Sequence, residues 1–172
     1  MVNPVGNHHQ AMGAPGSNPL ELLLFRLEGP QVYGINVARV REVIRCPELR
    51  HLPDAGPTNC GVVTLRGNTF AVTDTALAIG KSAITNVATG FVIVTASGHA
   101  THGLLVRDVE RIIKVSPADL QAPPKGISPA SYLVSVITFE GLFVEIIDFD
   151  RILRETLGHS ASDKHHPYSA AG

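Results

Sequence analysis

The sequence predicts a mainly β protein built from two similar sheet units packed on one another. Short apolar stretches recur between Gly, Pro and Asn residues, and an internal duplication relates the two halves of the chain. The chain has 172 residues, of which 44% are hydrophobic, so one ordinary core or two small units sharing a core can form. Either unit alone would bury too little apolar surface to be stable.

The apolar pattern assigns the individual elements. Strands are expected at residues 22–27, 32–35, 62–65, 69–73 and 91–95. Apolar residues spaced by three or four predict three helices, marked by Val37, Val40, Val43 and Ile44, by Val106, Val109, Ile112 and Ile113, and by Phe149, Ile152, Leu153 and Leu157. Asn36 and Asp148 are placed to cap the first and last helices. Pro47 and Pro117 are placed to end the first two.

The duplication appears when GINVARVREVI, residues 34–44, is laid over GLLVRDVERII, residues 103–113. A second match places RGNTFAVTD, residues 66–74, over EGLFVEIID, residues 140–148. Gly67 then lies opposite Gly141, and Asp74 lies opposite Asp148. We expect Gly67 to provide the permissive backbone of a hairpin turn, with Arg66 beside it projecting into water. A solvated turn arginine needs no functional role.

Composition restricts the classes of function. The net charge is −1 and the Lys and Arg residues are dispersed, which argues against a nucleic-acid partner, and no apolar run is long enough to be inserted in a membrane as a helix. Cys46 and Cys60 are expected to be inert buried thiols of a reducing cytoplasm. Residues 1–19 are predicted to be a disordered leader, residues 20–157 the folded domain and residues 158–172 a flexible tail.

Several segments in order resemble the CheW-like domain of bacterial chemotaxis coupling proteins. They are ELLLFRLEGPQVYGINVARVREVIRC, GVVTLRGNTFAVTDTALAIG, HGLLVRDVERIIKV and SYLVSVITFEGLFVEIIDFDRIL. The resemblance implies two SH3-like five-stranded β-barrels with interleaved strands around a shared hydrophobic core, and a few short helices including a C-terminal one. TDTALAIG, GLLV and SYLVSVI look more like the coupling domain of CheV, without the receiver domain that follows it in that family.

The resemblance also implies a function and its residues. Such domains are cytoplasmic adaptors associated with membrane-bound receptor arrays, and they join the tips of methyl-accepting chemoreceptors to the regulatory domain of the histidine kinase CheA. They need no cofactor and no small-molecule substrate. Receptor binding falls on Leu65, Arg66 and Gly67, and kinase binding falls on Val40, Glu42 and Val43. Ordinary core packing of Val40 and a solvated position for Glu42 are equally good interpretations.

Two other functions are left open by the sequence. A CheW-like domain could localise or tether a protein in receptor arrays without controlling the kinase. A small metal-dependent enzyme could use His99 and His102, although their loop offers no obvious third ligand. The sequence contains no G-x-S-x-G, no Gly-rich loop ending in Gly-Lys-Ser/Thr and no H-E-x-x-H. We therefore assign no catalytic residue and expect a protein that is not an enzyme.

Overall fold

The computed structural model describes residues 18–98, 100–124 and 132–162, and these form two five-stranded sheets. The first sheet has the strand order β8-β1-β2-β10-β9. Its strands are β1 (Leu20–Arg26), β2 (Val32–Asn36), β8 (Asp108–Val115), β9 (Leu133–Phe139) and β10 (Leu142–Ile147). The second sheet has the order β3-β6-β7-β5-β4. Its strands are β3 (Val40–Arg45), β4 (Asn59–Leu65), β5 (Asn68–Asp74), β6 (Phe91–Ser97) and β7 (Ala100–Val106). The mainly β prediction is confirmed.

The two sheets repeat each other strand for strand. β2 and β10 pair in parallel with Gly34 opposite Ile146, and β5 and β7 pair in parallel with Gly103 opposite Val72. These are the positions that the sequence duplication aligns. The halves also exchange strands, because β3 joins the second sheet and β8 joins the first. The structural units are therefore interleaved along the chain.

Each sheet closes into a small barrel by a backbone bridge between its two edges. After β3, the chain continues to Arg50, which exchanges two hydrogen bonds with Val62 of β4, at 2.9 and 2.8 Å. After β8, Gln121 exchanges two hydrogen bonds of 2.9 Å with Val136 of β9. Closure of this kind removes unpaired strand edges that would otherwise attract other chains.

The larger of two hydrophobic clusters joins the barrels. It contains residues of the first sheet such as Phe25 and Tyr33 together with residues of the second sheet such as Val72 and Leu104. The smaller cluster, around Leu24 and Val144, fills the first barrel. Because one cluster takes side chains from both sheets, the expected shared core is confirmed, and a close-packed core makes the two barrels one stiff body.

The prediction of a helix is wrong for two of the three segments. Residues 37–44 form a short 3-10 turn (η1, Val37–Arg39) followed by β3, and residues 106–113 belong mostly to β8. A β-bulge explains the misleading spacing. Val40 and Val43 pair with Thr95 and Ile93, which are two residues apart, so one extra residue on β3 puts positions three apart on the same face.

The same irregularity recurs in the second half. Val109 and Ile112 of β8 pair with Phe25 and Leu23 of β1 across a register shift. Their three-residue spacing therefore comes from a bulge at the equivalent position of the repeat. Pro117 does not end a helix, because it begins a further 3-10 turn (η3, Pro117–Asp119).

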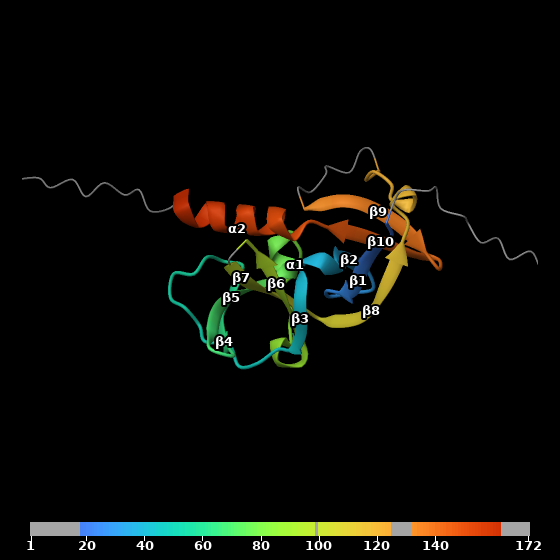
Figure 1. The fold of residues 1–172 in the computed structure, drawn as a ribbon. Coiled ribbons are helices and arrows are strands. Elements are labelled where there is room, and N and C mark those ends of the chain that lie inside the picture. The colour runs from blue at the N-terminus through green and yellow to red at the C-terminus, as the bar shows by residue number, and fades with distance from the viewer. Residues whose placement is uncertain (1–17, 99, 125–131, 163–172) are drawn as a thin grey trace, which may run out of the picture.

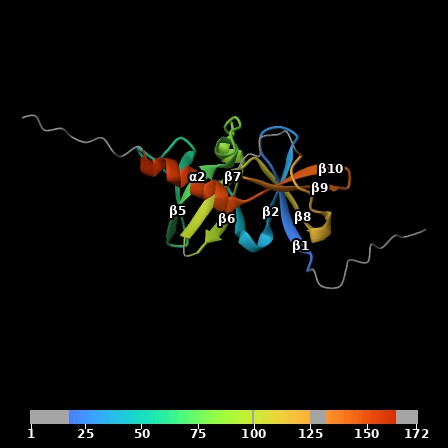
Figure 2. The ribbon, with the colours of Figure 1, turned by 90° about the horizontal axis from the view of Figure 1, so that it is seen from above.

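The third predicted helix is confirmed. α2 (Phe149–Ser162) starts after Asp148, whose carboxylate accepts hydrogen bonds from the backbone N–H groups of Asp150 and Arg151. Figures 1 and 2 show that α2 leaves β10 of the first sheet and extends over the second. Phe149, Ile152 and Leu153 are buried in the shared core, so α2 fastens the two barrels together. No helix within the described ranges is long and apolar enough to cross a membrane.

Candidate interaction surface at the arginine turn

Arg66 and Gly67 form the two-residue turn between β4 and β5. Both have left-handed backbone conformations, with φ of 50° and 79°. Two-residue hairpin turns favour positive φ because this matches the twist of the strands, and glycine adopts it without strain. The expected role of Gly67 is therefore confirmed. Arg66 is held at the tip of a short, well-paired hairpin, with Leu65 opposite Asn68.

The Arg66 guanidinium makes a two-pronged ion pair with Glu42 of β3. Its Nη1 atom donates to Oε1 at 2.7 Å, and Nη2 donates to Oε2 at 3.1 Å. The Arg66 side chain is 74% exposed, whereas that of Glu42 is 29% exposed. Exposed pairs stabilise proteins by at most about 1 kcal/mol. The pair thus orients the guanidinium on the surface, but separating Arg66 from Glu42 costs little free energy.

The structure places one predicted receptor-binding residue, Arg66, in contact with one predicted kinase-binding residue, Glu42. Leu65 and Val40 are half-buried and pack against the shared core, whereas Val43 is 36% exposed on β3. Arg66 of the receptor-binding set and Glu42 of the kinase-binding set are joined directly by their ion pair. The predicted receptor-binding and kinase-binding residues therefore form one continuous surface, which we call the arginine-turn surface, and they are not two separate patches.

An equivalent surface on the first barrel has its charges reversed. The turn between β9 and β10 is Glu140-Gly141, with φ of 48° and 77°, and Arg111 of β8 donates to Glu140 at 2.5 Å. Arg111 occupies the repeat position of Glu42, and Glu140 that of Arg66. Sequence reasoning aligned the two turns but missed this second ion pair. The signal was present in the duplication, since Arg66 aligns with the acidic Glu140 and Glu42 aligns with the basic Arg111.

The residues of the alternative metal site are only partly described. His99 lies outside the described residues, so the His-x-x-His pair is not placed. His102 is half-buried on β7, where its ring lies edge-on to the Phe149 ring with centroids 6.5 Å apart. Its Nδ1 has no hydrogen-bond partner among the residues that the structure describes. Among the residues that the structure describes, no cluster of three or more His, Cys, Asp or Glu could hold a metal ion.

Both cysteines are free, and burial controls their chemistry. Burial raises the pKa of Cys46, and burial followed by the nearby Asp74 charge raises the pKa of Cys60 to about 12. Thiols are nucleophilic as thiolates, so both groups are unreactive at neutral pH. This agrees with the expectation of inert thiols, although Cys60 is only half-buried.

His102 makes the fold sensitive to acid. Burial lowers its pKa below the ordinary value, so the unfolded chain binds a proton at this residue more readily than the folded chain. We expect the free energy of unfolding to fall as the pH drops below about 6.5, the ordinary histidine pKa. Urea unfolding across this pH range should show a shallower decline for His102→Gln than for the unaltered chain. Parallel curves would contradict this assignment.

Comparison with known proteins identifies the family. The model of the CheW-like domain matches residues 21–157. The chain belongs to this family. This CheW-like chain is 29% identical to the chemotaxis protein CheW of Rhizobium meliloti over 134 residues, which cover 77% of the chain and 86% of the relative. It is 24% identical to the CheW of Treponema pallidum over 160 residues, covering 87% and 91%.

A CheV protein and a solved structure also match. The chain is 33% identical to the chemotaxis protein CheV3 of Helicobacter pylori over 127 residues, which cover 67% of the chain but 38% of that protein. Its fold is similar to that of the scaffolding protein TtCheW from Thermoanaerobacter tengcongensis, with a TM-score of 0.69, 20% identity and coverage of 85% and 91%. The CheW-like fold predicted from the sequence is thus confirmed.

Proposed function

We propose that this CheW-like protein couples methyl-accepting chemoreceptors to the regulatory domain of the histidine kinase CheA through non-covalent contacts. It acts on the cytoplasmic side of the membrane, next to receptor arrays, as an adaptor that catalyses no reaction and binds no cofactor. The observation that supports this most directly is the Arg66 guanidinium, which is largely exposed and yet oriented by Glu42 on a stiff hairpin. The relatives of the chain named above are chemotaxis proteins, which also supports the proposal.

The Arg66–Glu42 pair provides a physical route for coupling. A guanidinium recognises carboxylates and carbonyl oxygens with its planar fork, so a receptor segment can replace Glu42 as the partner of Arg66. The exchange costs little because the pair is exposed. Glu42 is then released at the place where Val40 and Val43 are proposed to meet the kinase. Receptor binding thereby changes the charge that the kinase encounters.

Arg66→Ala tests the receptor contact. We expect it to weaken co-sedimentation with receptor fragments by roughly tenfold or more, since a charge-assisted hydrogen bond contributes about 1.5–3 kcal/mol. The melting temperature should change by no more than about 4 °C, because the lost surface pair contributes at most about 1 kcal/mol. Equal receptor binding by Arg66→Ala and the unaltered chain would refute the proposed role of Arg66.

Two controls sharpen this test. Arg111→Ala removes the arginine of the equivalent ion pair on the first barrel and should leave receptor binding unchanged. Exchanging the charges, with Arg66→Glu and Glu42→Arg together, restores an ion pair but moves the guanidinium to β3. If receptor binding returns in this double variant, binding depends on the ion pair and not on which of the two positions holds the arginine. Kinase assays complete the test, because a tether that only localises in arrays would bind without changing the phosphorylation rate.

A further inference from the structure

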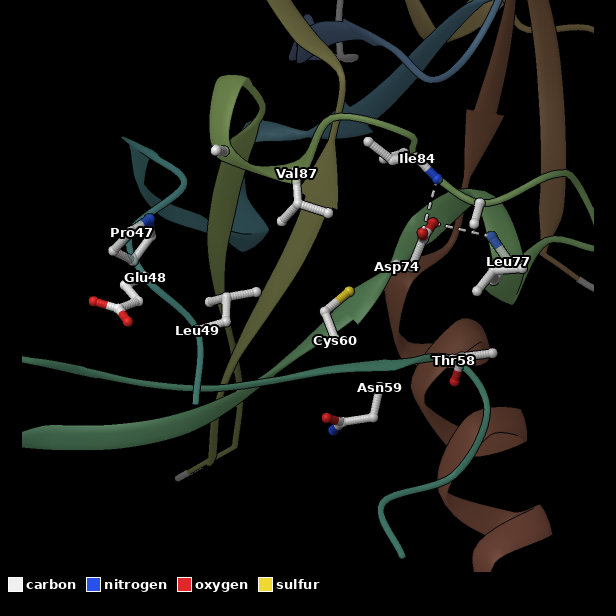
Figure 3. A pocket seen from close by; sticks show the side chains of 12 residues that line it. Pro47, Glu48, Leu49, Thr58, Asn59, Cys60, Asp74, Leu77, Ile84 and Val87 are labelled. Carbon is white, nitrogen blue, oxygen red and sulfur yellow. Dashed lines mark hydrogen bonds between the residues drawn. The ribbon is translucent and has the colours of Figure 1, made fainter. Parts of the chain in front are cut away.

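The second barrel contains a pocket that the arginine-turn surface does not use. Its volume is about 460 Å³, within the range of about 300–1,000 Å³ that is usual for ligand sites. The lining comes from three parts of the chain, namely the connector after β3, the start of β4, and the region from the end of β5 to the turn before β6. Figure 3 shows these segments around a space into which the Cys60 sulfur projects.

A buried carboxylate fixes the pocket walls. Asp74, at 4% exposure, ends β5 and caps the short helix α1 (Thr75–Ala78). Its Oδ1 accepts a hydrogen bond from the Leu77 N–H at 3.1 Å, and its Oδ2 accepts one from the Ile84 N–H at 2.9 Å (Figure 3). Its own N–H donates to the Thr58 carbonyl at 2.8 Å. Asp74 thus ties the residue before β4 to α1 and to the segment before β6, so two of the three lining parts are held in place relative to each other.

The lining is apolar with acidic groups as its only charges. Most of the lining side chains are aliphatic or small, and they include Pro47, Leu49, Leu77, Ala83, Ile84, Val87 and Ala88. The ionisable carboxyl groups are Glu48, which is exposed, and Asp74, whereas no lysine, arginine or histidine lines the pocket. Leu77 remains 37% exposed although it is a large apolar side chain. This combination suits an apolar group accompanied by a positive charge.

The pocket is well separated from Arg66. Cys60 lies near the start of β4, whereas Arg66 follows its last residue, Leu65. At about 3.3 Å per residue, the length of the strand between Cys60 and Leu65 is roughly 15–20 Å. A partner that occupies the pocket therefore does not have to displace a partner at the arginine turn.

We propose that this pocket is a second protein-docking site, which receives an aliphatic or aromatic side chain of a partner protein that carries a lysine or arginine next to it. The apolar side chain fills the space above Cys60, between Leu49 and Val87. The cation lies near Glu48 at the rim. The site goes beyond the proposed coupling function, because it requires neither Arg66 nor a chemoreceptor.

Three blocked tripeptides serve as probes in an NMR titration of the whole chain. Acetyl-Lys-Phe-Lys-amide combines the apolar group and the cations, acetyl-Glu-Phe-Glu-amide reverses the charge, and acetyl-Lys-Ser-Lys-amide removes the apolar group. We expect the first peptide, at millimolar concentration, to shift the backbone amide signals of Cys60, Leu77 and Val87. Its affinity should exceed that of each of the others by about tenfold. No shift at these amides, or equal shifts by all three peptides, would overturn the proposal.

Variants locate the binding in the pocket. Ala88→Phe fills the space from an exposed position of the wall, so it should abolish the shifts while the melting temperature is maintained. Glu48→Lys should reverse the preference in favour of the acidic peptide. Glu21→Lys, an exposed charge reversal on the first sheet, is the matched control and should bind like the unaltered chain. Unchanged binding by Ala88→Phe, or identical behaviour of Glu48→Lys and Glu21→Lys, would refute the assignment.

The Arg66→Ala variant separates this proposal from the coupling function. It should bind acetyl-Lys-Phe-Lys-amide as the unaltered chain does, even if it no longer attaches to receptors. Loss of peptide binding in Arg66→Ala would show that the arginine-turn surface, and not the pocket, holds the peptide.

Discussion

Replacing Asp74 with alanine is expected to lower the free energy of unfolding by roughly 2–4 kcal/mol, because a helix cap is lost and buried donors remain unpaired. The carboxylate is almost fully buried and accepts hydrogen bonds from the N–H groups of Leu77 and Ile84. Alanine cannot replace either bond, and water has little access to the site. Urea denaturation monitored by circular dichroism measures the change.

The duplication supplies a matched control for this prediction. Asp148 occupies the equivalent position and caps α2, and its N–H donates to the Tyr132 carbonyl at 2.8 Å as that of Asp74 donates to Thr58. The Asp148 side chain is 33% exposed, so water can take over its hydrogen bonds. Asp148→Ala should therefore cost only about 1 kcal/mol. Equal losses in the two variants would contradict the view that burial of Asp74 holds the pocket walls.

Gly103→Ala is expected to destabilise the protein by about 1–3 kcal/mol, the usual cost of overfilling a packed core. A β carbon at this position would lie 2.7 Å from Val92 Cγ1, 3.0 Å from Val72 Cγ2 and 3.3 Å from Phe70 Cε2. All three neighbours are buried and belong to the shared core, so none can move away freely. Thermal unfolding should show a melting temperature lower by roughly 2–4 °C per kcal/mol for a chain of this size.

Gly34 is the same residue at the same repeat position and provides the comparison. A β carbon there would lie 3.3 Å from Val144 Cγ1, and its next neighbours would be at 3.6 and 3.7 Å. A small shift of one side chain accommodates it. Alanine also restricts the unfolded chain, which stabilises by about 0.4–1 kcal/mol where the backbone is compatible. Gly34→Ala should thus be close to neutral. A loss as large as that of Gly103→Ala would show that space at the glycine is not the deciding factor.

The arginine turn illustrates how far sequence reasoning could reach. The alignment of RGNTFAVTD with EGLFVEIID placed Gly67 and Gly141 in equivalent hairpin turns, and both glycines have positive φ. A turn is a local feature, so the residues within it determine its geometry. The partner of Arg66 is 24 residues away, on a strand that the sequence predicted as helix. No local pattern could specify that contact.

The errors on β3 and β8 have a common physical cause. A strand normally places residues two apart on one face, but a bulge adds one residue and makes the spacing three, as between Val40 and Val43. Over so short a segment this spacing cannot be distinguished from that of a helix. Both segments are also edge strands, in which apolar residues do not follow burial. Glu42 holds a half-buried position of β3, and Ile112 holds an exposed position of β8, so the sequence shows no clear apolar alternation there.

The amino-acid order alone determined the features that depend on neighbours along the chain: the mainly β character, the twofold repeat, the hairpin turns and the aspartate that starts α2. Tertiary structure alone decided which half supplies each edge strand, which side chain orients Arg66, and where a pocket opens beside Asp74. The physical reason is that those features require segments distant in sequence to meet. Burial of the shared core determines which of these distant segments come into contact, and that burial depends on all the strands together.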